Sequence, residues 1–85
     1  MEINFHKRFD KQFIKLPTKA QQEFKQRLIL FIGNPFNHTL NNHILSGKYE
    51  GCRSINITGD LQAIYEIKNG SIYFMMIGTH SELYS

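Results

Sequence analysis

The spacing of hydrophobic residues changes partway along the 85-residue chain. In the first third these residues recur at the intervals of a helix, and after Gly51 they alternate with polar residues as in a half-buried strand. The change of period predicts two helices followed by a small sheet, which is an α+β fold.

Two antiparallel helices are predicted after a short strand at residues 1–5. The first runs for about ten residues from His6 and ends at Pro17, which cannot continue a helix. Thr18 to Gln21 matches a capping box and predicts the start of a second helix, which Gly33 ends. The expected apolar faces consist of Phe9, Phe13, Ile14 and Leu16 in the first helix and Phe24, Leu28, Phe31 and Ile32 in the second.

A three-stranded antiparallel meander is predicted over residues 52–58, 61–67 and 71–79. Its second turn contains Asn69-Gly70, a pair that tolerates the positive φ angles of a type I′ turn. The expected fold is a helical hairpin packed on one face of an antiparallel sheet, in one domain spanning residues 1–85, with the other face open. Alternation in the first strand places Arg53, Ile55 and Ile57 on one face and Ser54, Asn56 and Thr58 on the other.

Composition narrows the class of protein. No apolar stretch approaches the roughly 18 residues that span a bilayer, and the first residues lack a secretory apolar core, so we expect a cytoplasmic protein with no membrane partner. The single cysteine, Cys52, excludes an internal disulfide and fits a reducing compartment. Residues 1–27 contain seven Lys or Arg against three Asp or Glu, a balance that suits either an anionic partner or an ordinary solvated helix face.

The side chains able to transfer protons in the second half are His43, Asp60 and His80, with Tyr84 close by in sequence. Neighbouring strands of a meander run in opposite directions, so Asp60 and His80 should lie at the same edge of the sheet. A histidine beside a carboxylate suits proton transfer near neutral pH. Taken alone, however, Asp60 equally fits a turn residue and His80 a surface ring.

Other chemistries lack their sequence patterns. The histidines and Cys52 have no paired spacing typical of zinc, so we expect no metal site. The glycines form neither a phosphate-binding loop nor a dinucleotide fingerprint, and no nucleophile elbow surrounds the serines near the end. We therefore expect no cofactor.

The segment from His43 to Tyr84 resembles the RelE/ParE superfamily of bacterial toxins from type II toxin–antitoxin modules, and within it the YafQ-like branch. The similarity rests on four pieces in order: H-x-L-x-G-x-x-x-G-x-R, then I-T-G-D-L, then I-Y, then G-T-H-S-E-L-Y. It implies a RelE-like fold and a ribosome-dependent, metal-independent endonuclease that cuts mRNA in the ribosomal A site. It also implies attack by the ribose 2′-OH, giving a cyclic phosphate and a free 5′-OH, and a cognate antitoxin as partner.

The resemblance also implies roles for individual residues. His80 matches a catalytic histidine expected as general acid, and Asp60 an aspartate that acts as base or orients one. His43 matches an upstream histidine with a base or phosphate-contact role, and Tyr84 a terminal aromatic that stacks on the substrate base. Candidate RNA or phosphate contacts are Lys48, Arg53, Asn56 and Gln62, although Arg53 also fits a structural anchor.

Two positions depart from the family pattern. Asn56 stands where YafQ-like toxins have a further histidine, and Gln62 where many RelE-type relatives have a phosphate-stabilising arginine. Two alternatives therefore stay open: a ParE-like inhibitor of DNA gyrase, and a catalytically weak or silent binding module. The set formed by His43, Asp60, His80 and Tyr84 favours the nuclease, because a pure binder needs no proton-transfer groups.

Overall fold

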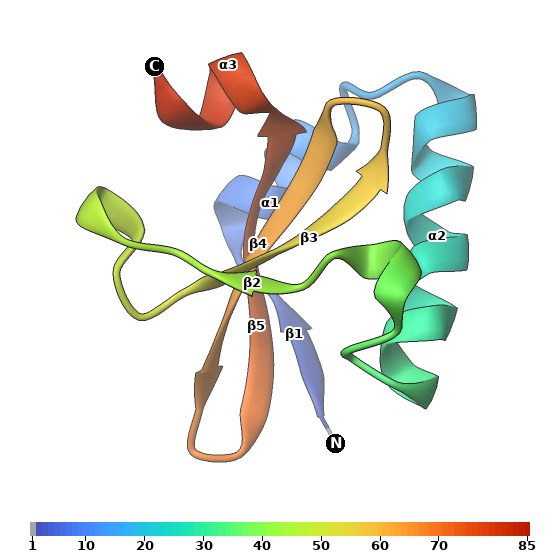
Figure 1. The fold of residues 1–85 in the computed structure, drawn as a ribbon. Helices are drawn as coiled ribbons and strands as arrows, with labels where there is room; N and C mark the ends of the chain where they lie inside the picture. Colours follow the sequence, from blue (N-terminus) through green and yellow to red (C-terminus); the bar gives the residue numbers. More distant parts are fainter. Residues whose placement is uncertain (1) are drawn as a thin grey trace.

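A five-stranded mixed sheet forms the centre of the protein in a computed structural model that describes residues 2–85 (Figure 1). The strands lie in the order β1-β5-β4-β3-β2. Their bounds are β1 (Ile3–Phe5), β2 (His43–Ile44), β3 (Arg53–Thr58), β4 (Leu61–Lys68) and β5 (Ser71–Thr79). The three long strands confirm the predicted meander.

Five helical segments accompany the sheet. They are α1 (Lys7–Phe13), α2 (Thr18–Gly33), the short 3₁₀ helices η1 (His38–Leu40) and η2 (Gly47–Tyr49), and α3 (His80–Tyr84). In Figure 1, α2 lies on one side of the sheet, whereas α3 and the turn containing η2 lie on the other. No helix within residues 2–85 is long and apolar enough to cross a membrane.

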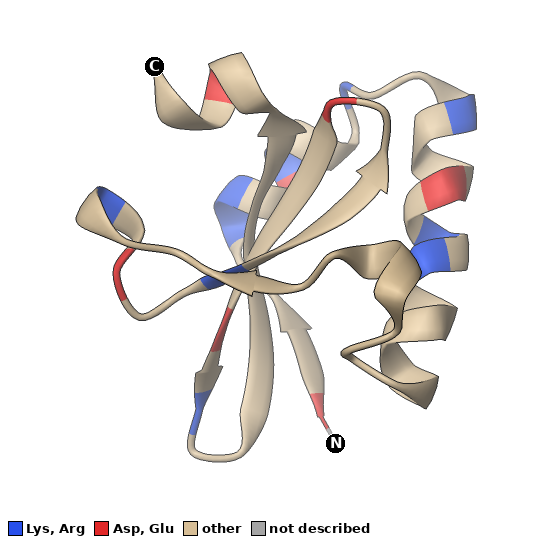
Figure 2. Ribbon diagram, viewed as in Figure 1, with Lys and Arg blue, Asp and Glu red and all other residues tan. Residues whose placement is uncertain are grey.

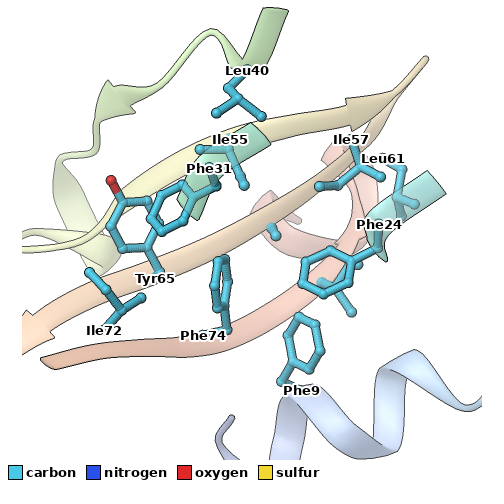
Figure 3. Packing of buried hydrophobic residues seen from close by; sticks show 12 residues of the cluster. Phe9, Phe24, Phe31, Leu40, Ile55, Ile57, Leu61, Tyr65, Ile72 and Phe74 are labelled. Atoms are coloured by element: carbon cyan, nitrogen blue, oxygen red, sulfur yellow. The ribbon is translucent and has the colours of Figure 1, made fainter. Parts of the chain in front are cut away.

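The core lies between the sheet and the two N-terminal helices and is rich in aromatic rings (Figure 3). Phe74 of β5 is at its centre, with ring centroids 5.9 Å from Phe9 of α1 and 5.6 Å from both Phe24 and Phe31 of α2. Edge-to-face and tilted aromatic pairs at such distances stabilise a core beyond their buried area. The helices therefore cover most of this face of the sheet, while Ile44 of β2 and Ile67 of β4 at its margin remain 71% and 62% exposed.

The helical pattern was partly wrong at its ends. Ile14 lies beyond α1 and is 73% exposed, and Ile32 is 56% exposed on α2. The predicted capping box at Thr18 does not form, because Pro17 occupies the N-cap position and has no backbone N–H to donate to a side chain. Gln21 instead donates to the carbonyls of Phe13 and Leu16 and so links the two helices.

The sheet differs from the prediction in one pairing. β1 runs parallel to β5, so the sheet is mixed rather than antiparallel. This pairing places Ile3 opposite Ile72 at the edge of the sheet, and a contact between residues so far apart in sequence leaves no local pattern. The prediction also omitted β2 and α3, which are too short to show a period. Met1, the first residue of the predicted N-terminal strand, lies outside the described residues.

Turns and bulges set the register of the strands. Asn69 and Gly70 have φ values of 53° and 78°, as the predicted type I′ turn requires. The β3–β4 ladder shifts register between Asn56 and Thr58, and the β4–β5 ladder shifts between Ile64 and Tyr65. These bulges lie on the strands that present the second face of the sheet.

Candidate active site

The face of the sheet opposite the core presents a group of polar side chains from three strands. His43 of β2 lies directly opposite Ser54 of β3, and Asn56 of β3 lies opposite Gln62 of β4. Residues opposite each other in an antiparallel pair point to the same face. The sheet therefore brings His43, Asn56 and Gln62 to one surface.

Helix α3 brings two further candidates to this surface. Thr79 and Glu82 form a capping box, in which the Thr79 hydroxyl accepts from the Glu82 amide and the Glu82 carboxylate accepts from the Thr79 amide. The helix turns the chain back over the sheet and buries Leu83, which is only 1% exposed. One helical turn then separates His80 from Tyr84, and their ring centroids are 4.7 Å apart.

Tyr49 of η2 holds α3 in place from the side. Its hydroxyl donates to the carbonyl of Leu83, and its ring packs edge-to-face on Tyr84 with centroids 5.4 Å apart. The ammonium of Lys48 lies 5.2 Å from the centre of the Tyr49 ring. A positive charge is thereby placed next to Tyr49, and Figure 2 shows blue on the turn before β3, where Lys and Arg are coloured blue.

A buried serine connects Tyr84 to the sheet. Ser54 is fully buried, and its hydroxyl donates to the Gln62 side-chain oxygen over 3.1 Å. Burial raises the pKa of Tyr84, a side-chain hydrogen bond with Ser54 partly offsets the rise, and neighbouring Tyr49 adds to it. Tyr84 therefore stays a neutral phenol near pH 7 and can donate a hydrogen bond.

The His43 ring has a defined neutral tautomer. Its Nδ1 lies 2.8 Å from the Asn41 carbonyl oxygen, which can only accept, so Nδ1 carries the proton. The Nε2 atom then holds a free lone pair on an exposed ring. A neutral imidazole of this kind can accept a proton.

Asp60 lies at the same end of the sheet as His80, as predicted. The pairing of Leu61 with Thr79 places their neighbours Asp60 and His80 at one edge. Both side chains are exposed, and among residues 2–85 no ion pair joins them. Asp60 occupies a tight turn whose first residue, Gly59, has a φ of 49°.

Arg53 is the one sequence candidate on the opposite face. Its Nε donates to the Asn42 side chain over 2.9 Å, and its guanidinium lies 5.2 Å from the centre of the Phe36 ring. These contacts tie β3 to the segment before β2. Arg53 is therefore not among the groups that surround Tyr84.

Sequence reasoning missed Ser54 and Tyr49 as members of the site. The Thr79-x-x-Glu82 spacing is a capping-box signature that could have revealed α3, and hence the buried neighbours of Tyr84. Within residues 2–85, no three His, Cys, Asp or Glu side chains are grouped closely enough to hold a metal ion.

Comparison with known proteins identifies relatives over the whole chain. A family model described as a bacterial toxin of type II toxin–antitoxin systems, YafQ, matches residues 1–85. The crystal structure of YafQ from E. coli is similar with a TM-score of 0.82 and 25% identity, covering 99% of this chain and 98% of that one. No curated protein sequence matches.

Two complexes are also similar. The E. coli DinJ–YafQ toxin–antitoxin complex has a chain with a TM-score of 0.78 and 25% identity, covering 99% of this chain and 97% of that one. The RelE–RelB complex from Pyrococcus horikoshii has a chain with a TM-score of 0.72, 18% identity and 92% coverage of both chains, which shows a shared fold. The full-length family match and the common RelE-like fold lead to one assignment: this chain belongs to the YafQ family of bacterial toxins of type II toxin–antitoxin systems.

Proposed function

We propose that this toxin is an endoribonuclease that cuts mRNA on the ribosome and so inhibits translation. The observation that carries the proposal is the gathering of His43, His80 and Tyr84 on one exposed sheet face, around the buried Ser54. Two imidazoles beside a phenol can supply the base, the acid and the substrate contact that RNA cleavage by its own 2′-OH requires.

In the proposed reaction, His43 removes the proton from the ribose 2′-OH through the free lone pair of Nε2. The 2′-oxygen attacks the adjacent phosphorus, and the bond to the 5′-oxygen of the next nucleotide breaks. His80 donates a proton to that leaving oxygen. The products are a 2′,3′-cyclic phosphate and a 5′-OH, and no metal ion takes part.

Negative charge builds up on the phosphate during this reaction and needs nearby donors. Lys48 supplies a positive charge, and the Tyr84 hydroxyl supplies a neutral donor. The Gln62 side-chain oxygen accepts a hydrogen bond from Ser54, so its NH₂ group remains to donate to the phosphate. Asn56, opposite Gln62, adds a second amide at the same place.

Asp60 has a supporting role in this proposal. Its carboxylate lies at the same edge of the sheet as His80 and can accept a hydrogen bond from the imidazole, which orients the ring toward the leaving oxygen. Arg53 holds β2 against β3 through Asn42 and so positions His43. Tyr84 stacks on a base as well as donating its hydroxyl, since its ring is half-exposed.

We also propose that a small antitoxin protein binds this chain and covers the site. Support comes from the DinJ–YafQ and RelE–RelB structures, in which similar chains are bound to such partners. Coexpression of the neighbouring gene should yield a stable complex and relieve growth arrest. A strongly expressed gene that is harmless, with no copurifying small protein, would disprove the partnership.

Primer extension on an mRNA translated in vitro tests the nuclease directly. We expect new 5′ ends on downstream fragments that require both ribosomes and His80, and His80→Ala or His43→Ala should slow their formation by about 10²- to 10⁴-fold. His38→Ala is the matched control, because His38 is an exposed histidine in η1, away from this face.

Circular dichroism must show that each variant is folded. Intact message together with halted DNA supercoiling by gyrase would overturn the proposal and favour a ParE-like inhibitor. Intact message without any effect on gyrase would also overturn it and leave a binding module.

A further inference from the structure

A small apolar hollow lies beside the candidate active site and has no role in the mechanism above. Its volume is about 160 Å³. Ile64 forms part of its wall and lies opposite Ser54 in the register of β3 and β4, and Tyr49 belongs to both the hollow and the site. The lining residues are His6, Arg8, Tyr49, Cys52, Ile64, Met75 and Met76, and we call this the methionine hollow.

The bulge in β5 explains why two consecutive methionines line one hollow. Ile64 pairs with Met76 and Tyr65 with Phe74, so Met75 is an extra residue without a partner on β4. Neighbouring residues of a regular strand would point to opposite faces. The bulge thus places two polarisable thioethers side by side, and such groups make favourable contacts with aromatic rings.

The rim of the methionine hollow offers hydrogen-bond donors. The His6 Nδ1 accepts from the Arg8 amide over 3.0 Å, so in the neutral ring the proton is on Nε2. The Arg8 guanidinium lies 4.0 Å from the Met76 sulfur. Within residues 2–85 the ion pair found joins Lys68 to Glu66, which leaves Arg8 without a carboxylate partner.

We infer that the methionine hollow binds one nucleobase of the RNA substrate, next to the bond that is cut. The inference rests on the proposed function, because the hollow continues the surface that would hold the RNA. Its apolar walls suit the faces of a planar ring, and the unpaired Arg8 suits a polyanion. Its volume is below the roughly 300 Å³ of sites that hold larger ligands, which fits a single ring better than a whole nucleotide.

The donors at the rim also predict which bases bind. Guanine presents two acceptors, O6 and N7, on one edge, and uracil presents carbonyl oxygens. Adenine has a donor amino group beside its N7, which would face the donors of Arg8 and His6. The methionine hollow should therefore prefer guanine and uracil to adenine.

Methyl resonances of methionine provide a direct binding test that needs no cleavage. The wild-type protein, labelled with ¹³C at the methionine methyl groups, is titrated with GMP, UMP and AMP. We expect the Met75 and Met76 signals, assigned with Met→Leu variants, to shift at lower concentrations of GMP and UMP than of AMP. Unmoved signals, or equal responses to all three nucleotides, would overturn the inference.

The matched variants are Arg8→Gln and Lys7→Gln, which remove one positive charge each from neighbouring positions of α1. Arg8→Gln should weaken GMP binding by about tenfold, and Lys7→Gln should leave it nearly unchanged. An equal loss in both variants would indicate long-range charge and would contradict the inference.

Cleavage separates this inference from the proposed function. If the wild type cuts mRNA, Arg8→Gln should lose base preference next to the cut, whereas His80→Ala should slow cutting by about 10²- to 10⁴-fold. If Arg8→Gln cuts with unchanged preference, the methionine hollow is not a base site although the nuclease stands. If the wild type does not cut, the proposed function fails, and the titration still decides whether the hollow binds a base.

Discussion

Tyr49 joins more parts of the candidate site than any other single side chain described above. It donates to α3 through the Leu83 carbonyl, packs on Tyr84, and forms part of the wall of the methionine hollow. A phenol with one buried end and one polar end suits such a junction. The position of Tyr84 therefore depends on a residue that the proposed chemistry does not use.

Replacing Tyr49 by Phe tests this dependence. The variant keeps the aromatic packing but leaves the Leu83 carbonyl without its donor, so we expect a loss of about 0.5–1.5 kcal/mol in the free energy of unfolding. Amide hydrogen exchange in α3 should also accelerate. Urea denaturation and exchange measurements check both.

Tyr73→Phe is the control for that change, because among residues 2–85 the Tyr73 hydroxyl makes no hydrogen bond to a side chain or backbone group. Equal stability losses in the two variants would contradict the role of Tyr49. Unchanged exchange in α3 would contradict it as well.

The raised pKa of Tyr84 predicts an alkaline loss of stability. The folded protein holds the phenol proton more tightly than the unfolded chain, so the contribution is constant below the ordinary value of 10.0 and is lost as the pH rises through the folded pKa. Urea midpoints measured from pH 8 to about 11 should fall more steeply for the wild type than for Tyr84→Phe. Parallel curves would refute the prediction.

At the residue scale, the sequence predicted the face on which a strand residue lies better than its long-range neighbours. Alternation along β3 correctly separated Asn56 from Ile55 and Ile57. The role of Ser54 was not predictable, because its side-chain hydrogen bond with Tyr84 joins residues from distant parts of the chain. Long-range contacts of this kind leave no local pattern.

At the element scale, α3 is a helix of only five residues. The capping box formed by Thr79 and Glu82 and the burial of Leu83 stabilise it. Helices this short are not stable by propensity alone. Its first turn supplies His80 and its last residue is Tyr84. Any change that loosens this helix should affect the site before it affects the global fold.

Thr79→Ala should demonstrate that separation. Loss of the capping hydroxyl should cost about 1 kcal/mol of stability, and cleavage of mRNA should fall more than the small unfolded fraction explains. Thr79→Ser retains an oxygen at the same position and should restore both properties. The prediction would fail if Thr79→Ala lowered stability but kept full activity.

The two capping-box patterns show how far local sequence determines an element. Thr18-x-x-Gln21 and Thr79-x-x-Glu82 look alike, yet only the second forms. The first box does not form because Pro17 occupies the N-cap position of α2. The Gln21 side chain instead donates to the carbonyls of Phe13, at the end of α1, and Leu16. The helical segments themselves were predictable, whereas the parallel pairing of β1 required the whole sheet.

At the scale of the whole molecule, positive charge is concentrated on the two N-terminal helices (Figure 2). Arg27 is partly structural, because its Nε donates to the Ile57 carbonyl over 2.8 Å. The exposed lysines, such as Lys19 and Lys25, have no such partner among residues 2–85. They are available to contact phosphates of ribosomal RNA in the proposed function.

Lys19→Gln tests that contribution. Ribosome binding measured by sedimentation between 50 and 200 mM salt should weaken, and the slope of log K against log salt should decrease in magnitude by about 1. Lys68→Gln is the control, because Lys68 lies 3.7 Å from Glu66 at the far hairpin. Identical slopes for wild type and Lys19→Gln would exclude a phosphate contact at Lys19.

The bulge at Met75 has a consequence for how this family can vary. Removing Met75 would make the pairing of Ile64 with Met76 and Tyr65 with Phe74 continuous, and every other side chain of β5 would keep its face. A one-residue deletion there is thus compatible with the fold, unlike a deletion elsewhere in the strand. A chain without this residue would have one methionine in place of two along the hollow, while it kept the same core and the same His80.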